Sequence, residues 1–115
     1  MVKVHILRNP RGQITTFTVE GHAGYGPRGT DIVCAAVSAL TFGTVNAIVE
    51  LLNVPLDVEL KEEGGFLRCK VPAHLERTVQ EKVDLLLDAM FLSLRSIEKE
   101  YHQHVRLVVQ ESKGD

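Results

Sequence analysis

Two stretches near the N-terminus alternate apolar and polar residues in the way typical of β-strands. Val2–Asn9 and Ile14–Glu20 are rich in β-branched residues, and the sequence N-P-R-G begins the segment between them. Proline presets φ at the second position of a turn, and glycine tolerates positive φ. The pattern therefore predicts a β-hairpin over residues 2–20.

The pattern changes from Asp31 to Leu52, where apolar residues occur almost all the way around a helix. Asp31 and Glu50 are the only charged residues in this stretch. A helix that is apolar on most sides must be covered on more than one side. A membrane span is the alternative, since a bilayer requires about 20 apolar residues. Several polar residues within the stretch and the lack of basic flanks favour burial in protein. These polar residues are Ser38, Thr41, Thr44 and Asn46.

The second half of the chain repeats the order of hairpin and helix. Val54–Lys61 alternates apolar and polar residues, E-G-G forms a turn, and Phe66–Val71 is the returning strand. Pro72 suits the first position of a helix, and apolar residues then recur at steps of three and four as far as Tyr101. Val105–Gln110 is the last predicted strand. The order β-β-α-β-β-α-β predicts an α+β fold with a mainly antiparallel sheet and two long helices.

Composition narrows the class of protein. The 115 residues suit a single domain over residues 1–115, large enough for a hydrophobic core of its own. The formal charge is −2 and no block of like charge occurs, so neither nucleic acid nor a membrane is an expected partner. The N-terminus has no signal-peptide pattern, and we expect a cytoplasmic protein. In a reducing compartment the two cysteines, Cys34 and Cys69, are not expected to form a disulfide.

A glycine-rich loop joins the first hairpin to the first helix. Its sequence G-Y-G-P-R-G, residues 24–29, formally matches the dinucleotide fingerprint G-x-G-x-x-G. The preceding strand is the second arm of a hairpin, however, and no acidic residue ends a following strand about 20 positions later, as a ribose site requires. The preferred interpretation is a flexible substrate loop that closes over an extended peptide, with Gly24, Gly26 and Gly29 giving it mobility.

His22 and Cys34 lie on either side of this loop and are the candidate catalytic pair. Cys34 is in the first turn of the predicted helix, where free N–H groups and the helix dipole favour a thiolate. Those N–H groups, including that of Cys34, are also the expected donors to an oxyanion. A dyad requires the loop to bring His22 back to the cysteine. The alternative is structural, with Cys34 a small core residue and His22 solvated.

The remaining polar residues have weaker signals. Asp31 suits the N-cap of the helix, and it could also orient His22. Ser38 lies one turn after Cys34, so its hydroxyl could bond to the carbonyl of Cys34 or reach the site. Cys69 shares a strand face with apolar residues and is expected in the core. His102 and His104 have no further ligand at metal-binding spacing, so neither a metal site nor a cofactor is expected.

Three segments together resemble the ribosomal-processing cysteine protease family. They are G-H-A at residues 21–23, D-I-V-C-A-A-V-S-A-L at residues 31–40 and F-G-T-V-N-A-I at residues 42–48. The order of the predicted elements also fits this family. The resemblance implies an enzyme that removes the N-terminal extension of ribosomal protein twenty-seven of the large subunit, cutting after a phenylalanine.

The same resemblance assigns roles to residues. The cysteine and histidine of the family fall on Cys34 and His22, and Asp31 and Ser38 match its supporting positions. It also implies a homodimer that acts on a ribosomal protein precursor, which agrees with the very apolar first helix. Two alternatives stay open at this point: a non-enzymatic ribosome-associated homodimer, and an acyl-transfer enzyme that uses the same dyad on a thioester.

Overall fold

A computed structural model describes residues 1–27 and 30–113. Its elements are β1 (Val2–Arg8), β2 (Ile14–Glu20), α1 (Ile32–Leu52), β3 (Asp57–Leu60), β4 (Phe66–Lys70), α2 (Arg77–Glu100) and β5 (Val105–Glu111). The predicted order of elements and the α+β class are confirmed.

The strands form one five-stranded sheet in the order β3-β4-β2-β1-β5. All neighbours are antiparallel except β1 and β5, which run parallel. The register places Phe17 of β2 between Ile6 of β1 and Cys69 of β4, and all three side chains are buried. Because residues that pair across a sheet point to the same face, this row forms part of the core.

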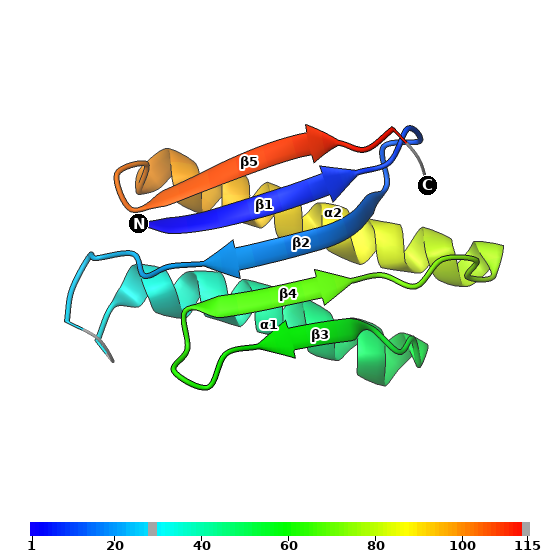
Figure 1. Cartoon of the computed structure of the whole chain (residues 1–115), viewed down its shortest axis with the longest axis horizontal. Coiled ribbons are helices and arrows are strands. Elements are labelled where there is room, and N and C mark those ends of the chain that lie inside the picture. The colour runs from blue at the N-terminus through cyan, green and yellow to red at the C-terminus, as the bar shows by residue number, and fades with distance from the viewer. Residues whose placement is uncertain (28–29, 114–115) are drawn as a thin grey trace.

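Both helices cover the same face of the sheet (Figure 1). α2 buries residues at helical spacing, namely Val83, Leu87, Met90 and Leu94. α1 buries Val33, Val37, Thr41, Val45 and Ile48. The apolar members of both sets and the inward-facing strand residues form one hydrophobic cluster, so the predicted amphipathic pattern of α2 is confirmed.

Two predicted elements have the wrong boundaries. The strand expected over residues 54–61 is reduced to Asp57–Leu60, because α1 ends with Asn53 in the left-handed conformation and Val54 turns into the core. The second helix does not begin at Pro72 but at Arg77. His74 has a φ of 62°, and a left-handed residue cannot lie within a right-handed helix.

α1 is long and apolar enough to cross a membrane by length and composition, with a mean hydropathy of 2.0. Its buried side contributes Val33, Val37, Val45 and Ile48 to the core, however, so moving the helix into a bilayer would remove part of that core. The core-helix interpretation fits this packing. α1 also exposes several large apolar side chains, among them Ile32, Phe42, Val49 and Leu51.

One end of the molecule brings together segments that are distant in sequence. The β2–α1 segment, the β3–β4 turn, the α2–β5 turn and the N-terminus all lie at the left of Figure 1. Two hydrogen bonds tie these segments to one another: Gly21 N–H donates to the Gly65 carbonyl at 2.9 Å, and Val2 N–H donates to the His104 carbonyl at 2.9 Å. The candidate residues lie at this end.

Candidate active site

Two cavities adjoin at the junction of β2 and α1. The first has a volume of about 270 Å³, and its lining comprises His22, Gly24, Gly26, Asp31, Cys34, Ala35 and Ser38. The second has a volume of about 330 Å³ and is more apolar. His22, Cys34 and Ser38 line both cavities. The loop therefore does bring the histidine and the cysteine, twelve positions apart in sequence, to one site.

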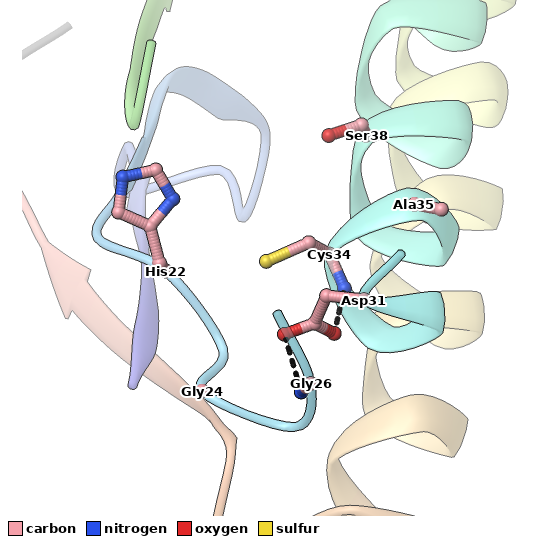
Figure 2. A pocket seen from close by; sticks show the side chains of 7 residues that line it. All are labelled: His22, Gly24, Gly26, Asp31, Cys34, Ala35 and Ser38. Carbon is pink, nitrogen blue, oxygen red and sulfur yellow. Dashed lines mark hydrogen bonds between the residues drawn. The ribbon is translucent and has the colours of Figure 1, made fainter. Parts of the chain in front are cut away.

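Cys34 occupies the third position of α1, and its sulfur points across the pocket toward the segment that carries His22 (Figure 2). The backbone N–H of Ala23 donates a hydrogen bond to Sγ at 3.1 Å. A donor that points at the sulfur and a position in the first helical turn are both features of the surroundings in which catalytic cysteines lie. The side chain is only partly buried, so a peptide can reach it.

Asp31 is the N-cap of α1 and uses both carboxylate oxygens. Oδ1 accepts from the N–H groups of Val33 and Cys34, both at 3.0 Å. Oδ2 accepts from Tyr25 at 2.9 Å and from Gly26 at 3.3 Å, which ties the glycine-rich loop to the helix (Figure 2). Burial by itself would raise the pKa of this carboxyl, but the four N–H donors outweigh it and hold the pKa below its ordinary value.

Two of the oxyanion donors expected from the sequence are already engaged. The N–H groups of Val33 and Cys34 are bonded to Asp31. The cap that stabilises the helix start thus occupies two of the donors that we expected to face the substrate. The N–H of Ala23, which points at the sulfur of Cys34, is a donor that the sequence pattern did not identify.

His22 is exposed and lies two residues after the end of β2. Within residues 1–27 and 30–113 its ring makes no hydrogen bond with Cys34 or Asp31, so the expected orienting role of Asp31 is absent from this geometry. Gly65 lies against the ring instead: a Cβ built on it would be 2.9 Å from Nε2 of His22. The ring therefore rests on the β3–β4 turn.

The other predicted residues have the following positions. Ser38 is exposed and lines both cavities, and no hydrogen bond from its hydroxyl to the carbonyl of Cys34 is present in the described part of the chain. Gly24 and Gly26 line the first cavity, and Gly29 lies outside the described residues. The mobility of this loop stays a prediction.

Cys69 is a core residue, as predicted. Its side chain is fully buried on β4. Burial, with a smaller effect of the nearby Asp57 carboxylate, raises the pKa of the Cys69 thiol to about 12. Cys34 and Cys69 are both free cysteines, so the expectation of no disulfide is confirmed.

Residues from the second half of the chain also reach the site, and the sequence pattern did not identify them. Gly65 supports the His22 ring, and Nδ1 of His104 lies 2.9 Å from the carbonyl oxygen of Ala23. His104 and Ala23 are separated by 81 positions, and no local pattern links them. The double glycine at residues 64–65 was the only signal in the sequence, and it indicated a turn.

The second cavity has an apolar lining beside the cysteine. Residues from both strand pairs and from α1 form it. The large apolar ones are Val2, Val19, Val37, Phe42, Leu60, Phe66 and Leu67. An opening of this composition suits an apolar side chain of a bound peptide.

The chain is similar to known proteases over nearly its whole length. The profile of a family described as Cysteine protease Prp matches residues 1–106. The Ribosomal processing cysteine protease Prp of Bacillus subtilis (strain 168) is 34% identical over 107 residues, 93% of this chain and 96% of that protein. The protein of the same name from Staphylococcus aureus (strain Mu50 / ATCC 700699) is 37% identical over 107 residues, 93% of this chain and 97% of that protein.

Solved structures agree with this similarity. The structure of an essential ribosomal processing protease Prp from S. aureus with a covalently linked product peptide has a TM-score of 0.87 and 36% identity. The structure of that protease with a substrate peptide has a TM-score of 0.81 and 35% identity. Each comparison covers 96% of this chain and 100% of the other. This chain therefore belongs to the cysteine protease Prp family and is an enzyme of that class.

Proposed function

We propose that this enzyme removes the N-terminal extension of ribosomal protein twenty-seven of the large subunit and cuts after a phenylalanine. Cys34 is the nucleophile and His22 is the general acid and base. The observation that carries the proposal is the shared position of His22 and Cys34 in two adjoining cavities, one of which is apolar. The names of the relatives, which are ribosomal processing proteases, support the choice of substrate.

The reaction follows from the chemistry of the pair. The thiolate of Cys34 attacks the scissile carbonyl carbon, and the carbonyl electrons move to the oxygen. When the intermediate collapses, the C–N bond breaks, and His22, as imidazolium, gives its proton to the leaving amine. A thioester remains on Cys34. His22 then takes a proton from water, the hydroxide adds to the thioester, and the C–S bond breaks to release the acid and the thiolate.

The apolar cavity holds the phenylalanine side chain in this proposal. Its lining includes Phe42, Leu60 and Leu67, and it adjoins the sulfur of Cys34. Burial of a phenylalanine contributes about 1.5–3 kcal/mol relative to leaving the side chain in water. A cleavage site preceded by an apolar aromatic residue is therefore preferred over one preceded by a charged residue.

The test uses the purified protein and a peptide that copies the extension and the first mature residues of the ribosomal protein. Mass spectrometry follows the cleavage products. We expect cleavage after the phenylalanine by the wild type, with losses of at least about 100-fold for Cys34→Ala and His22→Ala. His102→Ala is the matched control, because His102 is an exposed histidine outside both cavities.

Three outcomes would contradict the proposal. Undiminished cutting by Cys34→Ala would exclude the mechanism. Equal cutting of a peptide in which aspartate replaces the phenylalanine would exclude the role of the apolar cavity. A wild type that cuts neither peptide would exclude this ribosomal protein extension as the substrate.

We further propose that the enzyme is a cytoplasmic homodimer. The support is the number of large apolar side chains exposed on α1 and β3: Ile32 is 57% exposed, Leu51 is 75% exposed and Leu60 is 55% exposed. A second copy of the chain would cover part of this exposed apolar area, and soluble monomers rarely carry large apolar patches. Two free cysteines are consistent with a reducing compartment. Sedimentation at micromolar concentration tests the dimer, and a monomer there would contradict it.

A further inference from the structure

His104 makes a hydrogen bond that joins the α2–β5 turn to the catalytic segment. Its Nδ1 lies 2.9 Å from the carbonyl oxygen of Ala23. A carbonyl oxygen can only accept, so Nδ1 carries the hydrogen and donates it. The bond is therefore available to the neutral ring, in its Nδ1–H tautomer, as well as to the protonated ring.

Ala23 links this bond to both reacting side chains. It directly follows His22 in the chain, and its own N–H donates to Sγ of Cys34 at 3.1 Å. Its side chain is 2% exposed, so the residue cannot move without disturbing the core. A donor that fixes the carbonyl of Ala23 thus also fixes the N–H that faces the sulfur and the backbone that carries His22.

The ring of His104 is itself held in place. The Tyr25 ring stands at 82° to it, with centroids 5.3 Å apart, and at 87° to the Tyr101 ring at 5.5 Å. Edge-to-face pairs of this kind are favourable. The backbone of His104 is also bonded on both sides, since its N–H donates to Tyr101 at 2.8 Å and its carbonyl accepts from Val2. The turn is a rigid anchor for the catalytic segment.

We propose that His104 is a positioning residue: its Nδ1–H holds Ala23 so that the Ala23 N–H faces the thiolate of Cys34 and His22 faces the same pocket. The inference rests on the proposed catalytic roles of His22 and Cys34. The proposal assigns a function in the reaction to His104, a residue far along the chain from the nucleophile Cys34. The His104 ring bonds to Ala23, and His104 is not itself part of the lining of either cavity, so the ring acts through the backbone.

A pair of variants of nearly equal shape separates the hydrogen bond from packing. In His104→Asn the amide nitrogen takes the place of Nδ1 and still donates, whereas in His104→Asp an oxygen takes that place and repels the Ala23 carbonyl. His102→Asp is the control for the added charge, because His102 is exposed in the same turn. Thermal unfolding verifies that each variant is folded.

The first readout is cleavage of the ribosomal peptide. We expect His104→Asn to keep kcat within about twofold of the wild type, and His104→Asp to lose on the order of tenfold in kcat with a smaller change in KM. The control His102→Asp should retain wild-type kcat. Equal kcat values for the Asn and Asp variants would overturn the proposal, because packing alone would then explain the residue.

The second readout does not depend on the proposed substrate. Iodoacetamide labels Cys34 in the absence of peptide, and mass spectrometry gives the rate at pH 7. We expect the labelling rate of Cys34 to be several-fold lower in His104→Asp than in the wild type, and to be close to the wild-type rate in His104→Asn. Labelling at the wild-type rate in a folded His104→Asp variant would overturn the positioning role. If the wild type cuts no peptide, the function proposed above fails, and the labelling rates still decide the role of His104.

Discussion

Gly65 lies against the imidazole of His22, so closely that a Cβ on Gly65 would be 2.9 Å from Nε2 and 3.2 Å from Cε1. Real Cβ atoms do not approach other heavy atoms to such a distance. Gly65 also has a φ of +74°, a conformation that other residues rarely adopt. The turn between β3 and β4 is thus shaped around the proposed catalytic base, and a larger residue would displace the ring.

The first prediction concerns this contact. Gly65→Ala should lower kcat by at least about tenfold, because the methyl group pushes the imidazole out of its position. Gly12→Ala is the matched control: Gly12 has a φ of +81°, and nothing lies within 4 Å of the position that its methyl group would take. Both variants should lose about 1 kcal/mol of unfolding free energy to backbone strain, and only Gly65→Ala should lose activity.

Cleavage rates and urea unfolding of the two variants supply the measurement. Equal kcat values for Gly65→Ala and Gly12→Ala would show that the position of the ring does not depend on the turn.

The second prediction is that the two cysteines differ sharply in reactivity. With a pKa of about 12, Cys69 has roughly one thiolate in ten thousand molecules at pH 8, and it is fully buried. Cys34 is partly exposed and accepts the N–H of Ala23. Iodoacetamide followed by peptide mapping should modify Cys34 alone in the folded protein, and both cysteines in denaturant. Labelling of Cys69 before Cys34 would contradict the assignment.

The third prediction concerns Asp31, whose two oxygens serve two different segments. Asp31→Asn keeps one oxygen for the helix N–H groups, but its amide nitrogen cannot accept from Tyr25 and Gly26. We expect a lower melting temperature and a partial loss of cleavage, smaller than that of His22→Ala.

The difference in melting temperature between wild type and Asp31→Asn should depend on pH with a definite sign. The pKa of Asp31 is lowered in the folded protein, so its stabilisation is complete above the ordinary value of 3.8 and disappears as the pH falls through the lowered pKa. The melting temperatures of wild type and Asp31→Asn should therefore differ most near neutral pH and converge in acid. A difference that persists unchanged at pH 2 would mean that the carboxylate charge is not responsible.

The fourth prediction tests the dimer through the exposed side of α1. Val49 is 38% exposed, and α1 exposes other large apolar side chains as well. Val49→Glu places a charge among them. Burial of an unpaired charge is unfavourable, so the dissociation constant should rise by at least about tenfold. Ser96→Glu on α2, also an exposed site, is the control for the change of charge. Sedimentation velocity over a dilution series gives both constants.

The fifth prediction concerns the glycine-rich loop. Gly24 has a φ of +69° and open space around it, and such a residue has many alternative conformations without ligand. A bound peptide should select one of them and slow amide exchange at Gly24. Protection that is equal with and without a non-cleavable peptide would exclude closure of this loop.

The sequence alone determined the features that depend on neighbours within one or two turns of chain. Period-two alternation located β1 and β2, period-3.6 spacing located α2, and Asp31 marked the start of α1. The motifs around His22 and Cys34 identified the family, because each motif is a continuous segment. The predicted boundaries were wrong where one residue overrides the pattern. The left-handed residues His74 and Asn53 delay the starts of α2 and β3.

Only the tertiary structure decided how the site is held together. The N–H groups at the start of α1 donate to Asp31, and the same carboxylate accepts from the glycine-rich loop. This arrangement depends on where both ends of the loop lie, which only the folded chain shows. Gly65 and His104 reach the site because the strand order brings their turns to the end of β2. No pattern in the sequence predicts that these turns lie close to that strand end. Local periodicity arises from the backbone geometry of each element, whereas contacts across 81 positions arise from the packing of elements, which a linear pattern does not contain.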